Sequence, residues 1–239
     1  DYYIHKFLFR ICKLSVIYTF ILAYNHIKQV VSYYNNYHMF GMFRQLLNLL
    51  YKRRCYICKS TRDNAILCND CLKKIRFLPT KPVKIINNAD VYSMTIYTGI
   101  IMKMIRGLKY HRKKDLAYYH AKLMYDYWKE LHEDKEEYII VPVPMHKTRE
   151  KQRGYNHMNL IAQEFAKLSG YEINTNLIYR TKNTTPQYAL SKEERESNLK
   201  NAFGINTKNI KLLRGKKILI LDDIITTGRT ISEMVSTLR

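Results

Sequence analysis

Residues 218–230 read ILILDDIITTGRT, and this stretch decides the fold. Its four leading apolar residues predict a short buried strand of a parallel sheet, which ends at two adjacent carboxylates, Asp222 and Asp223. A hydroxyl-rich turn follows, and then one helix face is indicated by Ile231, Met234, Val235 and Leu238. A strand, a turn and a helix N-terminus form an anion site, because free backbone N–H groups point at the bound group. The two aspartates add acceptors for sugar hydroxyls or for a hard cation such as Mg²⁺.

The middle of the chain alternates strand patterns with helix patterns. We predict strands at 91–98, 138–143 and 176–179, and helices at 100–108, 116–131, 158–168 and 192–198. This alternation predicts an α/β fold with a largely parallel sheet. Ligands of such sheets bind outside the carboxyl ends of the strands. We therefore expect the loop at 141–144 and the loop at 222–230 to converge on one site.

A strongly basic loop follows the strand at 138–143 and reads MHKTREKQRGYNH at 145–157. One interpretation is a solvated, mobile loop. The other is a flap, hinged at Gly154, that brings Arg153 and its neighbouring cations over a polyanion such as pyrophosphate. Asn156 is a suitable N-cap for the helix that follows.

Two CxxC pairs, Cys55 with Cys58 and Cys68 with Cys71, lie nine residues apart, whereas Cys12 is isolated. Two such turns facing each other complete a tetrahedral site of four thiolates, which suits Zn²⁺. A redox dithiol is the competing interpretation, but the long helix and buried strand typical of that motif are missing. We expect structural zinc that closes a module too small to fold on its own core.

The formal net charge of +21 has two interpretations. A basic surface raises affinity for phosphate backbones. Alternatively, the abundance of Lys, Asn, Ile and Tyr reflects an AT-rich genome, and the basic residues are spread along the chain.

Residues 1–42 are unlike the rest and are expected to be an atypical N-terminal extension, with Met39 or Met42 as the true start. The apolar run at 8–24 contains Arg10 and Lys13, and its uninterrupted part is too short to span a bilayer. No small-residue cleavage site follows it. We expect no stable membrane insertion and a cytoplasmic protein.

Five segments together resemble the ComF family of competence proteins: CYICKS with LCNDCL, YTGIIMKMIRGLKY, VPVPMHKTREKQRGYNHMNLIA, RTKNTTPQYALSKEERESNLKNAF and ILILDDIITTGRT. They occur in the family's order across roughly residues 43–239. The resemblance implies a zinc-ribbon module at 43–78 and a type I phosphoribosyltransferase-like domain at 79–239. It also implies a further strand beyond Arg239, and a role in DNA uptake beside the competence helicase machinery.

The resemblance also assigns site residues. Asp222 and Asp223 would bind the ribose hydroxyls of phosphoribosyl pyrophosphate, with Mg²⁺ nearby, and Val143 would approach the pyrophosphate. The loop that would hold the 5-phosphate consists of Thr226, Thr227, Gly228, Arg229 and Thr230. The loop that carries Arg153 and Gly154 would be the mobile cover of the site. The residues on family-pattern positions are Lys109, Arg153, Asn156, Gln187, Arg195 and Asn198. His157 stands where the family usually has Gln, which leaves that contact open.

Two functions remain in competition. The first is a phosphoribosyltransferase, in which pyrophosphate is displaced from the anomeric carbon by an acceptor that the sequence does not identify. The second is a non-catalytic accessory protein that binds single-stranded DNA. The basic segments 109–114 and 147–153, with Tyr110 and Tyr155 for base stacking, fit the second function.

Overall fold

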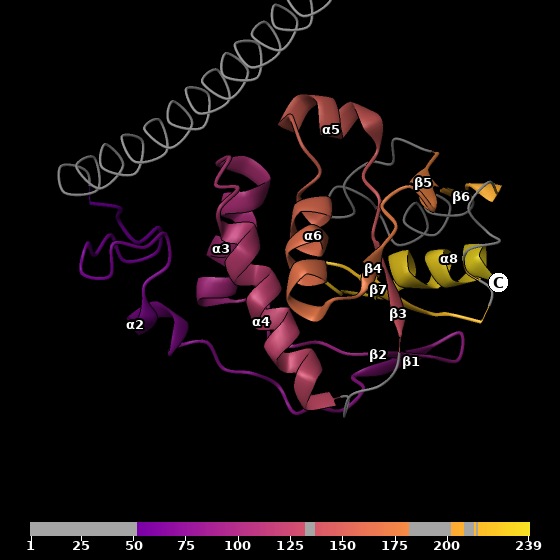
Figure 1. Ribbon diagram of the computed structural model, residues 1–239, viewed down its shortest axis with the longest axis horizontal. Coiled ribbons are helices and arrows are strands. Elements are labelled where there is room, and N and C mark those ends of the chain that lie inside the picture. Colours follow the sequence, from indigo (N-terminus) through magenta and orange to yellow (C-terminus); the bar gives the residue numbers. More distant parts are fainter. Residues whose placement is uncertain (1–51, 132–136, 182–201, 208–212, 214) are drawn as a thin grey trace, which may run out of the picture. The chain divides into compact units, whose positions relative to one another are not determined.

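The computed structural model describes residues 52–131, 137–181, 202–207, 213 and 215–239 (Figure 1). Residues 54–239 form one compact unit. The N-terminal extension, the helix expected at 192–198 and three of the family-pattern residues lie outside the described residues; those three are Gln187, Arg195 and Asn198.

A parallel sheet of three strands lies at the centre, in the order β4 (Glu172–Ile173), β3 (Tyr138–Pro142) and β7 (Lys217–Leu221). The register pairs Tyr138 with Lys217 and Pro142 with Leu221, so β3 and β7 end level with each other. One residue further on, the Val143 N–H donates to the Leu221 carbonyl at 2.9 Å. The α/β fold with a parallel sheet is therefore confirmed, and the two loops expected to converge leave the same edge.

Helices pack on both faces of this sheet (Figure 1). On one side are α3 (Gly99–Tyr110), α4 (Leu116–Leu131) and α6 (His157–Ser169), and on the other is α8 (Arg229–Leu238). Strand β3 serves both layers because successive side chains point to opposite faces. Ile140 is fully buried in the core with α3, α4 and α6, whereas Ile139 and Val141 are buried with Met234 of α8.

The cysteine module, with its short helix α2 (Asn69–Leu72), shares the first of these cores. Cys55 and Leu67 belong to the same buried cluster as Met104 and Leu108 of α3. The hydroxyl of Tyr56 is also hydrogen-bonded to Nδ1 of His111, at the end of α3. The module and α3 are therefore packed as one body.

A β-hairpin follows the module, formed by β1 (Lys84–Ile86) and β2 (Ala89–Val91). Its two turn residues, Asn87 and Asn88, have φ of 48° and 56°, as a two-residue hairpin turn of mirror-image type requires. The strand predicted at 91–98 is therefore wrong, since only Val91 of that range is in a strand. Most of the range is irregular because it pairs locally with the linker before it: Leu78 N–H donates to the Met94 carbonyl at 2.9 Å.

A second small antiparallel sheet pairs β5 (Ile178–Arg180) with β6 (Phe203–Ile205). It packs through Ile178 and Phe203 in the core that contains α8. Within the described ranges, no helix combines the length and apolar character needed to cross a bilayer.

Candidate functional site

The two adjacent aspartates follow β7 directly, and the carboxylate of Asp223 is held by two side chains from other elements. Its Oδ2 lies 2.6 Å from Nζ of Lys109, near the end of α3, and 2.7 Å from Nε2 of His157, the first residue of α6. Only 7% of the Asp223 side chain is exposed. Asp222 turns one oxygen back to the chain, where it accepts from the Asp223 N–H at 2.9 Å. Two helices from the same face thus deliver two nitrogen donors to one carboxylate.

The environment drives the pKa values of the two aspartates apart. Burial and the neighbouring charge of Asp223 raise the pKa of Asp222 to about 7. Burial alone would also raise the pKa of Asp223, but the hydrogen bond from His157 and the charge of Lys109 outweigh it and lower that pKa. At neutral pH Asp223 is therefore the permanent anion, and Asp222 is the group that exchanges a proton with its surroundings.

His157 also contacts Arg153, the last residue of α5 (Lys147–Arg153). Nη1 of Arg153 donates to Nδ1 of His157 at 2.8 Å. Because a guanidinium can only donate, this contact assigns the imidazole proton to Nε2, which donates to Asp223. Burial lowers the pKa of His157, which favours the neutral imidazole that this assignment needs.

The basic segment 145–157, expected as a loop, contains the short helix α5, and this expectation is corrected. His146 caps its start by accepting from the Thr148 N–H at 3.2 Å. Gly154 ends it in a left-handed conformation with φ of 82°. Asn156 caps the next helix through a 3.0 Å bond from the Met158 N–H, as predicted. The segment therefore contains one capped helix and the capped start of another, whereas its high charge had suggested a loop.

The turn after the aspartates leads into α8 through Gly228, which has φ of 82°. A side chain here would be strained by that φ, and its Cβ would also collide with the side chain of Ile86 on β1. Thr226 and Thr227 are exposed, whereas Arg229 and Thr230 are partly buried at the start of α8. The exposed hydroxyls and the helix start give this turn the form expected of an anion site.

The hairpin braces this turn, and sequence analysis missed that contact. Lys84 Nζ donates to the Thr227 carbonyl at 2.8 Å, and Asn87 Nδ2 donates to Ser232 Oγ at 3.3 Å and Ser236 Oγ at 3.1 Å. The Asn-Asn pair is a sequence signal for the hairpin turn, but nothing local indicates where the hairpin docks.

A second missed residue is His120 of α4, which is 1% exposed. It lines a cavity of about 400 Å³ together with Asp222, Asp223 and aromatic side chains that include Tyr127 and Trp128. Among the described residues His120 Nδ1 has no hydrogen-bond partner. Burial lowers the pKa of His120 to about 4, so it is a neutral imidazole behind the acid pair at neutral pH.

The predicted site residues therefore fall into groups. Lys109 reaches Asp223 directly and Arg153 reaches it through His157, while Gly154 and Asn156 shape the link between α5 and α6. Val143 is buried at the end of β3, with its N–H committed to Leu221.

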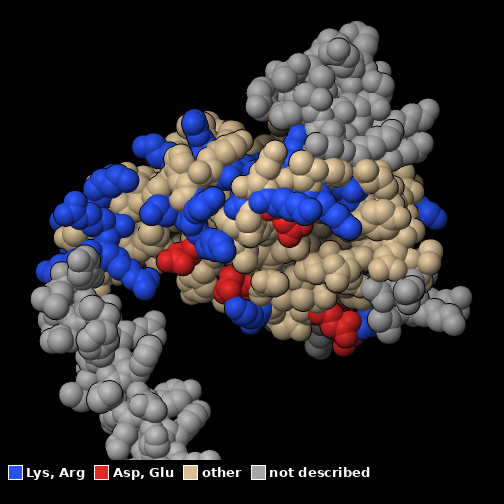
Figure 2. All heavy atoms as spheres, turned by 90° about the horizontal axis from the view of Figure 1, so that it is seen from above, with Lys and Arg blue, Asp and Glu red and all other residues tan. Residues whose placement is uncertain are grey.

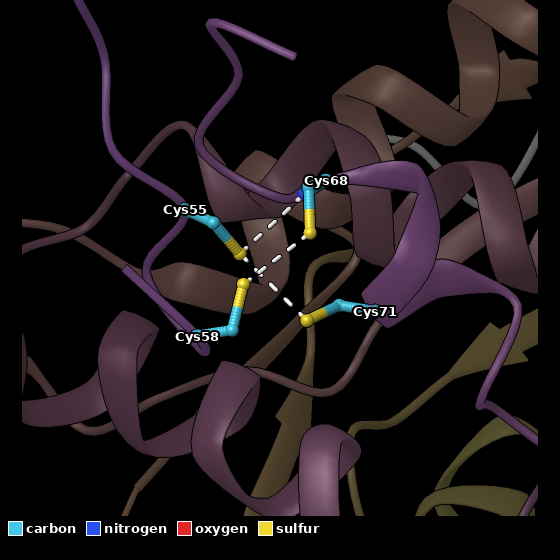
Figure 3. A group of neighbouring side chains, drawn as sticks. All are labelled: Cys55, Cys58, Cys68 and Cys71. Atoms are coloured by element: carbon cyan, nitrogen blue, oxygen red, sulfur yellow. Dashed lines mark hydrogen bonds between the residues drawn. The ribbon is translucent and has the colours of Figure 1, made fainter. Parts of the chain in front are cut away.

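The four cysteines of the two CxxC pairs meet in one cluster (Figure 3). Their sulfurs all lie within 4.8 Å of one another, with Cys58 to Cys68 at 3.5 Å and Cys55 to Cys71 at 3.8 Å. A tetrahedral metal with sulfurs at about 2.3 Å would space them by ~3.8 Å. The Cys68 N–H also points at Cys55 Sγ, at 3.5 Å. The cluster could hold a metal ion.

Basic side chains gather on the face that carries α5. Figure 2, which views the molecule from that side, shows Lys and Arg spread across it. Tyr110 is 65% exposed there, and the guanidinium of Arg153 lies 5.9 Å from its ring centroid. Tyr155, expected to be available for stacking, is 8% exposed and donates its hydroxyl to the Leu108 carbonyl. That part of the expectation is wrong, because Tyr155 is used to hold α3.

Comparison with known proteins identifies the C-terminal half. Residues 125–239 match the family model described as a phosphoribosyl transferase domain. The chain is 34% identical to competence protein F of Haemophilus influenzae over 111 residues, which cover 46% of this chain and about half (48%) of that protein. It is 28% identical to the DNA utilization protein YhgH of Escherichia coli over 77% of this chain and 83% of that protein. It is 23% identical to competence protein ComFC of Bacillus subtilis over 74% and 68%.

These findings confirm the resemblance to the ComF proteins and the phosphoribosyl transferase fold. The names of these relatives refer to competence and to DNA utilization.

Proposed function

We propose that this protein binds phosphoribosyl pyrophosphate with Mg²⁺ at the carboxyl ends of β3 and β7 and acts in the handling of imported DNA in the cytoplasm. The observation that carries the proposal is the buried Asp223, held by Lys109 and His157 beside the exposed turn that begins α8. A fixed anion beside a helix start suits a ligand that has sugar hydroxyls next to a phosphate. We propose that residues 79–239 form the domain that binds this ligand and that residues 43–78 form the metal-binding module.

Each part of the ligand has a partner of matching chemistry. The turn from Thr226 to Thr230 would hold the 5-phosphate through backbone N–H groups and hydroxyls. Asp222 and Asp223 would accept hydrogen bonds from the ribose hydroxyls. Arg153 and the loop at Val143 would face the pyrophosphate.

Catalysis would follow from the same arrangement. Departure of pyrophosphate leaves positive charge on the ribose, which the anionic Asp223 stabilises, and negative charge on the leaving group, which Lys109 and Arg153 stabilise. Mg²⁺, when bound, would neutralise the charge of the pyrophosphate oxygens. We therefore propose pentosyl transfer as the reaction class.

Zn²⁺ is the metal that we propose for the cysteine cluster. Four thiolates with no oxygen or imidazole ligand suit a closed, structural zinc site. The cluster lies in the core with Leu108 of α3, so the metal would support the helix that carries Lys109.

Calorimetry of the full chain with phosphoribosyl pyrophosphate and Mg²⁺ tests the ligand. We expect saturable heat from the wild type and a strong loss of binding for the double variant Asp222→Ala plus Asp223→Ala. A matched control is Asp126→Ala, which removes an exposed carboxylate on α4. Equal heats from the wild type and the double variant would remove the site assignment. Pyrophosphate release in the presence of candidate acceptors then separates a transferase from a binding protein.

A second function, binding of single-stranded DNA, is favoured by the exposed Tyr110, whose ring centroid lies 5.9 Å from the guanidinium of Arg153 in α5. Base stacking on an aromatic ring contributes about 1–3 kcal/mol per base, and phosphate contacts make affinity fall with salt. We expect Tyr110→Ala to weaken binding of an oligothymidine without changing the salt dependence. Tyr118→Ala, which removes an exposed ring on α4, is the control. Equal affinities of the two variants would count against stacking at Tyr110.

A further inference from the structure

Three side chains link the basic helix α5 to the acid pair in an unbroken line. Arg153 is the last residue of α5, His157 is the first residue of α6, and Asp223 follows β7. The imidazole lies between the other two, 2.8 Å from the guanidinium and 2.7 Å from the carboxylate. His157 is 6% exposed, so both hydrogen bonds are largely shielded from water.

The direction of the two hydrogen bonds is fixed by chemistry. A guanidinium has no acceptor, and an ionised carboxylate has no donor. The residue between them must therefore accept on one side and donate on the other. A neutral imidazole does so, and among the other side chains an amide can, because its oxygen accepts while its nitrogen donates.

Helix α5 does not contribute to the buried core. None of its residues is buried, whereas α6 is anchored in the core through Met158 and Ile161. Only Gly154, Tyr155 and Asn156 connect the two helices, and Gly154 is in the left-handed region. The contact of Arg153 with His157 therefore joins the end of α5 to a helix that is anchored in the core.

We propose that His157 is a positioning residue that ties α5 to Asp223, so that the cover over the site and the acid that binds the ligand move as one. The second half of this statement rests on the proposed function. A ligand that fixes the position of Asp223 would then also fix Arg153. Loss of the bridge would lower the affinity for the ligand, because α5 would no longer be held over the site.

Two substitutions of His157 separate the bridge from simple bulk. His157→Gln keeps an acceptor and a donor, whereas His157→Phe keeps a flat ring and loses both. Arg153→Met breaks the same line from the other end and leaves the contacts of Asp223 with Lys109 and His157 in place. Melting temperatures establish that each variant is folded.

Hydrogen–deuterium exchange of the α5 amides, read by mass spectrometry without ligand, tests the bridge itself. Loss of a buried, charge-assisted hydrogen bond costs roughly 1.5–3 kcal/mol, so we expect the α5 amides of His157→Phe and Arg153→Met to exchange about tenfold or more faster. Exchange in His157→Gln should stay close to the wild type. Equal exchange in His157→Gln and His157→Phe would overturn the proposal, as would wild-type exchange in Arg153→Met.

Titration with phosphoribosyl pyrophosphate and Mg²⁺ tests the coupling separately. We expect ligand to slow α5 exchange in the wild type and His157→Gln, and to have much less effect on α5 in His157→Phe. If the exchange results hold and no protein binds the ligand, the bridge stands and the proposed ligand fails. If ligand binds all variants equally and protects α5 equally, the coupling is overturned.

Discussion

Lys109 and Asp223 form an ion pair, with Nζ 2.6 Å from Oδ2, that joins the end of α3 to the end of β7. The pair compensates the charge of Asp223 and leaves Asp222, its neighbour in the chain, as the buried carboxyl with a raised pKa. The two aspartates are therefore expected to differ in how they affect stability and binding.

The first prediction concerns pH. The folded-state pKa of Asp222 is about 7, above the 3.8 that is usual for an aspartate, so the folded protein retains a proton that the unfolded chain loses. The stability contributed by this group is full at low pH and is lost as pH rises to about 7. We expect Asp222→Asn, which resembles the protonated acid, to melt progressively higher than the wild type as pH is raised from 5 to 8.

The difference between the two proteins is the quantity to measure, because the lowered pKa values of His120 and His157 also make stability depend on pH. Burial lowers the pKa of both, which gives them the opposite trend. They are present in wild type and variant alike and largely cancel in the difference. A difference in melting temperature that does not change between pH 5 and pH 8 would contradict the raised pKa of Asp222.

The second prediction concerns Gly228. Its φ of 82° and the nearby Ile86 side chain both disfavour a Cβ. Gly170 has a φ of 75° with nothing within 4 Å of the added Cβ, so Gly170→Ala carries backbone strain alone. We expect about 1 kcal/mol of destabilisation from Gly170→Ala, and more from Gly228→Ala, in urea unfolding. Equal destabilisation by the two substitutions would mean that Ile86 moves aside for the added methyl group at no cost in free energy.

The third prediction concerns Lys84. Its hydrogen bond holds the Thr227 carbonyl, so its loss should loosen the turn that is proposed to bind phosphate. We expect Lys84→Met to lower the affinity for phosphoribosyl pyrophosphate by about three- to tenfold, since one hydrogen bond contributes about 1 kcal/mol. Lys81→Met removes a charge from an exposed position on the same segment and is the control for electrostatics. If Lys81→Met lowers the affinity for the ligand by the same factor, the effect comes from the lost charge and not from the contact with Thr227.

The fourth prediction concerns the cysteine cluster. We expect about one equivalent of zinc per chain, and a large fall in melting temperature when a strong chelator removes it, because metal binding contributes to folding. Cys58→Ser should lose the metal, although Cys58 is the exposed member of the cluster. Cys12→Ser changes the isolated cysteine and should keep it. Full zinc content in Cys58→Ser would contradict a site of four thiolates.

The parts of the fold that are local in sequence could be predicted. The strand at 218–221, the two aspartates and the helix after Gly228 are consecutive, so their pattern specifies them together. The CxxC pairs likewise lie close enough for their spacing to predict the cluster.

Contacts between distant segments could not be predicted. The docking of Lys84 on Thr227 and the contact of His157 with Asp223 depend on how separate elements are brought together. The apolar residues at 92–98 suggested a strand, but this segment forms hydrogen bonds with the linker before it, from Leu78 N–H to the Met94 carbonyl and from Thr95 Oγ1 to the Arg76 carbonyl. The helix α5 was not predicted because its residues are mostly charged and show no apolar periodicity; it is stabilised by caps at both ends.

The shared core of the cysteine module and α3 limits how this protein can be divided. A fragment that begins at residue 79 would keep the phosphoribosyl transferase match but would uncover Met104 and Leu108, which pack with Cys55 and Leu67. Exposed apolar area of this kind promotes aggregation. The two modules should therefore be expressed together. The boundary between residues 78 and 79 separates two kinds of site, but it is not a suitable position for a truncation.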